Sequence, residues 1–187
     1  MSLVDKLLAN PAPEWAPRPQ VLVSDPIPVA LHGRAPRSVL GTEWWDAVRF
    51  NAYRSTNYHC IACTVKRGAH WCNRLEGHEV YEIDYLLGRM TYLETVPLCY
   101  RCHKYIHRGY LNVQREQGII TLSEYNTIVR YGDDILRISG IKRPDPYRGP
   151  QAEWKDWRLV IGNAEFPPLF ASFKEYQEHY ATINEEG

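Results

Sequence analysis

The sequence predicts an α+β protein organised around a zinc-stapled finger. Two Cys-x-x-Cys pairs about 35 residues apart are a strong signal for one tetrahedral zinc site. Between the pairs, residues 75–85 and 93–98 carry β-forming residues with polar residues among them. The second pair continues into residues 99–108, where histidines recur at helical spacing. The predicted fold is therefore a pair of strands followed by a helix, held together by one metal ion.

The composition is that of a globular chain. The 187 residues are 44% hydrophobic and 12% aromatic, enough to bury a core. The formal net charge is zero, so no global field draws the chain to a polyanion. Any contact with nucleic acid must therefore come from a local basic patch.

Membrane insertion and secretion are both argued against by the sequence. No apolar run approaches the roughly 18 residues that a membrane helix needs. Pro11, Pro13, Pro17 and Pro19 interrupt any hydrophobic region of a signal peptide. We therefore expect a cytoplasmic protein without a membrane partner. In that compartment, cysteines favour metal binding over disulfides.

The N-terminal third is rich in proline. Residues 2–9 predict a short amphipathic helix, and residues 10–40 predict an extended segment with polyproline character. Such a segment wraps the domain or serves as an arm for a partner. We assign residues 1–41 to this Pro-rich arm.

A helix over about residues 43–54 should lead into the first cysteine pair. Thr42 is a suitable N-cap, and Glu43 and Asp46 lie where the helix dipole favours acids. Trp44 and later apolar residues follow helical spacing.

Four cysteines form the predicted zinc site. A two-residue spacer lets one tight turn direct both thiolates of a pair at one ion. Four thiolates leave no open coordination position, so such a site is structural. The fifth cysteine, Cys72, is expected to be a partly buried free thiol. The predicted ligands are Cys60, Cys63, Cys99 and Cys102.

Turn residues punctuate the finger and the segment after it. Residues 86–92 contain a glycine and predict the loop between the two strands, and Gly109 is expected to end the helix. Residues 110–121 predict loop and short strand. A helix over 124–131, capped by Ser123, should break at Gly132, ahead of a Pro-rich segment over 140–152.

The C-terminal segment predicts a hairpin and a helix. Residues 157–161 and 164–166 flank Gly162-Asn163, a turn with glycine first. Ser172 and Glu175 form a capping box for a helix through about Ala181. The predicted organisation is the arm, a zinc domain over 42–110, and a helical and hairpin extension over 111–187.

Three histidines lie within or beside the finger. His103 and His107 are four residues apart, so on a helix their imidazoles share one face. His78 lies in the string Leu75-Glu-Gly-His-Glu79 of the first predicted strand. These nitrogen ligands lie beside, but not within, the predicted zinc site.

Residues 44–110 resemble the HNH family of nucleases, whose active site is a ββα-metal finger. In that family two Cys-x-x-Cys knuckles pin the finger, and the closing helix offers His-x-x-x-His after Leu-Cys-x-x-Cys. The segment from Val96 to His107 fits this pattern closely. Residues 75–79 fit the opening Leu-Glu-x-His-His element in part.

The resemblance implies metal-dependent hydrolysis of DNA phosphodiester bonds. Matched without a gap, it makes His78, His103 and His107 the ligands of a catalytic Mg, Mn, Ni or Zn ion. The general base then falls on Glu79, and the asparagine that orients the base falls on Glu94. Both positions depart from the family pattern, since a carboxylate with a reference pKa of about 4.3 is a weak base at neutral pH.

A second alignment remains open. It makes His78 the base and places Gly77, which has no side chain, where a metal-binding acid belongs. Glu76 or Glu79 would then replace that acid. In either alignment, basic residues near the histidines suit a polyanionic substrate. The expected phosphate contacts are Arg74, Arg101, Lys104 and Arg108.

Two other functions compete with a nuclease. The departures at Glu79 and Glu94 are also compatible with a catalytically degenerate finger that binds DNA or a protein, for example a host factor if the gene is viral. The third alternative is a structural zinc protein whose histidines only pack.

Overall fold

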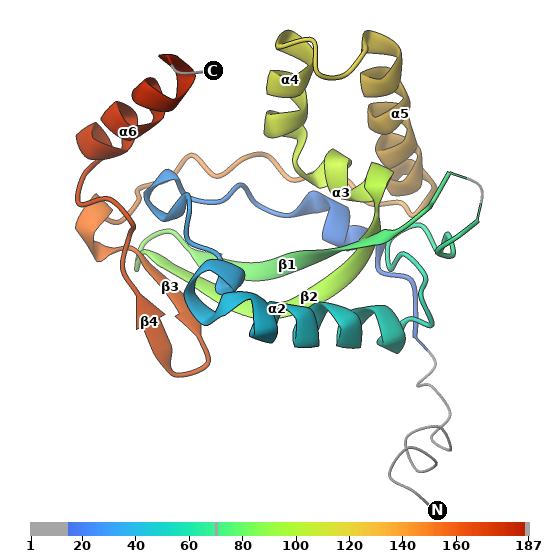
Figure 1. Cartoon of the computed structure of the whole chain (residues 1–187), viewed down its shortest axis with the longest axis horizontal. Coiled ribbons are helices and arrows are strands. Elements are labelled where there is room, and N and C mark those ends of the chain that lie inside the picture. Colours follow the sequence, from blue (N-terminus) through green and yellow to red (C-terminus); the bar gives the residue numbers. More distant parts are fainter. Residues whose placement is uncertain (1–14, 70, 186–187) are drawn as a thin grey trace, which may run out of the picture. The chain divides into compact units, whose positions relative to one another are not determined.

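The computed structural model describes residues 15–69 and 71–185 (Figure 1). The helix predicted over residues 2–9 lies outside them. The described chain forms two compact units that interleave in sequence. The first unit takes residues 15–23, 48–78 and 95–143, and the second takes 24–47, 79–94 and 144–185. The predicted division at residues 41 and 110 stays a prediction.

Helices and one sheet confirm the predicted α+β class. In the sheet order β1-β2-β3-β4, β2 and β3 are parallel, with Met90 opposite Leu159, and β3 and β4 are antiparallel. The second strand begins at Arg89 and is longer than predicted. The loop predicted over residues 86–92 is a tight turn at Gly88 (φ +66°). The strands are β1 Leu75–Asp84, β2 Arg89–Cys99, β3 Arg158–Ile161 and β4 Ala164–Phe166.

Two helices follow β2 where one helix and a loop were predicted. Helix α3 spans Tyr100–Ile106, the chain bends at His107, and helix α4 spans Arg108–Glu116. Gly109 therefore does not end a helix but lies inside α4. Burial of Leu111 and Gln114 on one side of α4 stabilises helix where local sequence predicted loop.

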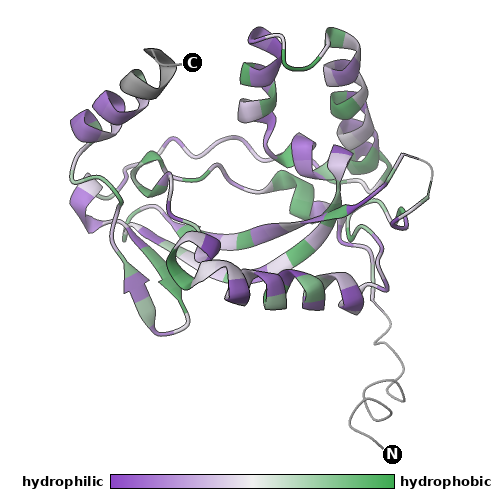
Figure 2. Cartoon of the chain, in the orientation of Figure 1, coloured by the Kyte–Doolittle hydropathy of each residue, from purple (hydrophilic) through white to green (hydrophobic). Residues whose placement is uncertain are grey.

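Helix α5, Leu122–Ile138, runs through Gly132 without a break. Its N-cap is Thr121, whose Oγ1 accepts from the Glu124 N–H at 3.1 Å, and not the predicted Ser123. Hydrophobic and hydrophilic residues mix along α5 (Figure 2), and Ile128, Gly132 and Leu136 are its buried positions. Gly132 is required by packing, because a Cβ there would lie 2.2 Å from the Tyr105 ring.

The extended conformation predicted over residues 10–40 is wrong for residues 19–23, 29–31 and 36–40, which are helical. The 3₁₀ helix η1, Pro19–Val23, buries Val21 and Leu22 and packs against α3 and α5. A second 3₁₀ helix, η2, spans Val29–Leu31. Helix α2, Pro36–Ser55, contains the predicted helix over 43–54 and is interrupted at Gly41 (φ +85°).

The C-terminal prediction is confirmed. Strands β3 and β4 flank a turn with Gly162 at φ +58°, after a 3₁₀ helix, η3, over Trp154–Asp156. Helix α6, Phe173–Glu185, starts at the predicted cap, where Ser172 Oγ accepts from the Glu175 N–H at 3.2 Å. The core of the second unit consists of Ala30, Leu31, Met90, Trp157 and Leu159.

None of the helices in the described residues is both long enough and apolar enough to cross a membrane.

Two helical glycines give opposite predictions for stability. Gly132→Ala should destabilise the protein by about 1–3 kcal/mol, because the new methyl group overlaps the Tyr105 ring. Gly109→Ala meets no atom within 4 Å and should be neutral or stabilise by up to about 1 kcal/mol. Urea unfolding of both variants measures the difference. Equal changes in the free energy of unfolding for the two variants would show that the contact between α3 and α5 at Gly132 is looser than described.

Candidate metal centre

The four predicted cysteines lie together in the first unit. Their sulfur atoms are all within 4.8 Å of one another, and the Sγ atoms of Cys63 and Cys99 are 3.6 Å apart. Tetrahedral zinc with Zn–S bonds of about 2.3 Å separates its sulfurs by about 3.8 Å. The donor type, number and spacing therefore fit a closed, structural metal site.

Backbone hydrogen bonds shape the first cysteine pair. The Thr64 N–H donates to the Cys60 carbonyl at 2.9 Å, and Thr64 adopts a left-handed conformation (φ +62°) that turns the chain. The Ile61 N–H donates to the Pro97 carbonyl at 2.9 Å, which ties this turn to the end of β2. Cys99 then ends β2 and Cys102 lies in the first turn of α3, so the second pair spans a strand-to-helix junction.

The sulfur atoms are too close to titrate independently. Hydrogen bonding with Cys102 lowers the pKa of the Cys63 thiol far below its ordinary value. Hydrogen bonds with the other three thiols raise the pKa of Cys102. A bound dication would stabilise all four as thiolates, which is the usual state of a zinc site.

Three histidines form a second group of possible ligands in the same unit. Their ring nitrogens lie within 4.8 Å of one another. His78 comes from β1, whereas His103 and His107 come from the last turn and the C-cap of α3. The ring centroid of His78 is 5.4 Å from that of His103 and 5.0 Å from that of His107. The three histidines named from the sequence therefore lie together, and their role as metal ligands stays a prediction.

His78 is the buried member of this group. It is 5% exposed, and its Nδ1 atom is buried without a hydrogen-bond partner among the described residues. Burial, followed by the charges of His107 and His103, lowers the pKa of His78 to about 3. The imidazole is therefore neutral at pH 7, the form in which histidine binds metals. An unsatisfied buried nitrogen calls for a partner, and an ion shared with the other two histidines would supply one.

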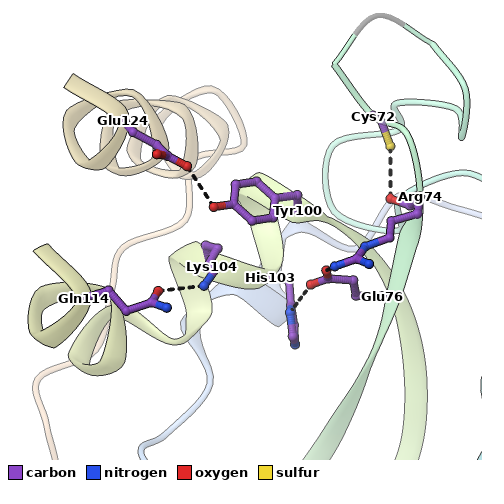
Figure 3. Close-up of polar contacts among 8 residues, drawn as sticks. All are labelled: Cys72, Arg74, Glu76, Tyr100, His103, Lys104, Gln114 and Glu124. Carbon is purple, nitrogen blue, oxygen red and sulfur yellow. Dashed lines mark hydrogen bonds and ion pairs between the residues drawn. The ribbon is translucent and has the colours of Figure 1, made fainter. Parts of the chain in front are cut away.

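Glu76 holds His103 in place (Figure 3). The His103 Nδ1 and Glu76 Oε2 atoms are 2.5 Å apart, and Arg74 donates to Glu76 Oε1 at 3.0 Å. The hydrogen bond with His103 is the main cause that lowers the pKa of Glu76. A carboxylate on the outer nitrogen of a histidine is the usual support of a metal ligand, because it fixes the tautomer and the ring orientation.

The supporting role of Glu76 was missed in the sequence, where it was only an alternative ligand. The signal was available, since residues two apart on a strand share a face, and Glu76 and His78 are two apart. Glu79 follows His78 and so faces the other side of β1 with Tyr81, whose pKa is raised by burial and then by the Glu79 charge. Glu79 and Glu94 belong to the second unit, and their proposed roles stay predictions.

The predicted phosphate contacts have partners within the first unit. The Arg101 guanidinium lies 4.1 Å from the centroid of the Trp71 ring, and Lys104 Nζ donates to Gln114 Oε1 at 2.6 Å. The Arg108 Nη1 atom is 3.8 Å from Asp133. Arg74 pairs with Glu76 but keeps 75% of its side chain exposed. By the exposure of its side chain, Arg74 is therefore the most accessible of the four.

Charge in the first unit is strongly positive. Its described residues include fourteen Lys and Arg and five Asp and Glu, a formal net charge of +9. The zero net charge of the whole chain conceals this excess, because the acidic residues are concentrated in the other unit.

Comparisons with protein families, curated proteins and solved structures found no match for this chain. The fold and the site define its class. It is an α+β protein with a four-cysteine cluster that could hold a structural metal and a three-histidine group that could hold a second ion.

Zinc content tests the cysteine site. The purified protein should hold one zinc per chain at this site, and Cys102→Ser should remove it and unfold the first unit, because metal binding supplies folding free energy. Cys72→Ser should retain the zinc, since Cys72 lies outside the cluster. Atomic absorption and circular dichroism measure both effects. Retention of zinc by Cys102→Ser would contradict the assignment.

Glu76→Ala tests the support of His103. Loss of the carboxylate should weaken Mn²⁺ or Ni²⁺ binding at the histidine group by about 10–100-fold. Titration calorimetry on zinc-loaded protein measures the affinity. Glu116→Ala is the matched control, because within residues 15–69 and 71–185 Glu116 pairs only with Arg115 on α4. Unchanged affinity in Glu76→Ala would show that Glu76 does not orient a ligand.

Proposed function

We propose that the protein is an HNH-like, metal-dependent endonuclease that hydrolyses DNA phosphodiester bonds. The finger of this proposal consists of β1, β2 and α3, with zinc on the four cysteines as its structural ion. The order of two neighbouring strands and a helix, with one cysteine pair before β1 and the other at the end of β2, supports this interpretation.

The observation that carries the proposal is the three-histidine group. Neutral, buried His78 from β1 lies within ligand distance of His103 and His107, and a carboxylate supports His103. If the three histidines served packing alone, their rings would not need to converge. A buried ring nitrogen would also be expected to have a hydrogen bond. The burial of His78 and its place within ligand distance of His103 and His107 support the alignment in which His78 is a ligand.

Each residue has a defined task in the proposed reaction. His78, His103 and His107 hold the divalent ion, which when bound would stabilise charge on the phosphate and on the leaving oxygen. Glu76 fixes the ring of His103. Glu79 occupies the general-base position of the family pattern. Glu94 occupies the orienting position of the family pattern.

The charge of the first unit supports a polyanionic substrate. A net charge of +9 over its described residues raises the local concentration of nucleic acid and speeds its association. Arg74, with its exposed guanidinium, is the proposed first phosphate contact. Arg101, Lys104 and Arg108 are further proposed contacts on α3 and at the start of α4.

A second candidate function is a degenerate finger that binds DNA or a protein without cutting. The observation that favours it is the pair of glutamates at the base and orienting positions. Of these, Glu79 faces the side of β1 opposite to His78.

A plasmid-nicking assay tests the nuclease. Supercoiled plasmid should be relaxed with Mg²⁺, Mn²⁺ or Ni²⁺, and His78→Ala and His107→Ala should each lower the rate by about a hundredfold or more. His179→Ala is the control, because that histidine lies exposed on α6 and contacts the Phe170 ring.

Two results separate the candidates. Tight, salt-dependent DNA binding without turnover in any of the three ions would favour the degenerate finger. Nicking that survives both histidine variants would show that a different site, or a contaminant, cuts the plasmid.

A further inference from the structure

The second unit carries a net negative charge. Its described residues include seven Lys and Arg and fourteen Asp and Glu, a formal net charge of −7. Such a field repels nucleic acid and attracts cations. A ligand drawn to this unit by its charge would therefore be cationic.

An open pocket of about 680 Å³ lies wholly within the second unit. Four carboxylates line it, and they come from three separate segments of the chain: Asp25 before η2, Glu82 and Asp84 on β1, and Asp145 in the Pro-rich segment. Thus folding, and not a local run of acids, brings these charges to one cavity.

Most of these carboxylates have no partner. Within the described part of the chain, the side chains of Asp25, Glu82 and Asp145 make no hydrogen bond or ion pair. Asp84 Oδ1 accepts from two backbone N–H groups of the turn that follows β1. Arg89 is the one cation among the lining residues, and it is paired with Glu165. The pocket therefore keeps a net negative charge.

Stacked aromatic rings form part of the pocket lining. The Tyr85 and Tyr147 centroids are 4.2 Å apart and the ring planes differ by 9°. The Tyr147 hydroxyl donates to the Pro150 carbonyl at 2.8 Å, which fixes that ring. Aromatic faces next to carboxylates bind a flat, delocalised cation better than a small, strongly hydrated one.

The carboxylates are not arranged for a metal ion. Among the described residues, the groups of three or more side chains close enough to share an ion are the cysteines and the histidines of the first unit. No three of the pocket carboxylates therefore lie close enough to share one ion as they stand, whereas a larger cation with several N–H donors can contact carboxylates that are farther apart.

We propose that this pocket binds a guanidinium group. The planar cation would stack on the tyrosine rings while its N–H groups donate to Asp25, Asp145 and the free side of Asp84. A free guanidine compound and an arginine side chain of a partner protein share this chemistry. Exposed Leu86 and Leu87, 66% and 65% exposed beside the pocket, offer apolar contact to residues that flank such an arginine.

Calorimetry on the zinc-loaded full chain tests the proposal. The probes are agmatine, the capped peptide Gly-Arg-Gly and the matching peptide with lysine. We expect the arginine peptide to bind more tightly than the lysine peptide, with affinity that falls as NaCl rises. Equal binding of agmatine and the arginine peptide would identify a small-molecule site. Binding of the peptide alone would identify a protein partner.

Variants locate the binding. Asp25→Asn with Asp145→Asn should weaken the arginine peptide by about tenfold or more, and Tyr147→Leu should also weaken it. Asp156→Asn is the control, because this acid of the same unit lies outside the pocket. Thermal unfolding checks that each variant folds. Absence of binding by both guanidinium probes, equal weakening by the control, or displacement by micromolar Ca²⁺ would overturn the proposal.

Discussion

The four-sulfur cluster is the constraint on which the first unit depends. It joins a turn that follows α2 to the junction of β2 and α3, across more than thirty residues of intervening chain. Buried thiols so close together are a poor arrangement without a dication, and a strong one with it. The backbone hydrogen bond from Ile61 to Pro97 fastens the same two segments beside the metal ligands. The cluster therefore lies at the point where β2 ends and α3 begins.

The histidine group follows from that junction. Once Cys102 is held, His103 and His107 must project from the next turn of α3, and His78 reaches them from β1. With an ion on the cysteines the histidine group would stand on a rigid scaffold, and Glu76 adds a fixed ring orientation for His103. Loss of that ion would then disperse the three histidines.

Charge is divided between the units, although the sequence averages to zero. Basic residues predominate in the unit that holds the cysteine and histidine groups, and acidic residues predominate in the unit with the carboxylate pocket. Since each unit takes several separated segments, the full size of this division appears only when the segments of one unit are summed. A chain without net charge can in this way present one surface to a polyanion and another to a cation.

Short-range patterns were enough to predict the cysteine and histidine groups, the first strand, the C-terminal hairpin and the cap of α6. Each depends on spacing within a few residues, where backbone geometry dictates the outcome. Failures occurred where packing overrides local preference. Gly132 predicts a helix break, yet the helix continues there because the Tyr105 ring packs where a side chain would be. Parts of the Pro-rich segment are helical, with Leu22 and Leu31 buried. The Glu76–His103 contact and the acidic pocket depend on residues brought together by folding, so they became visible only in three dimensions.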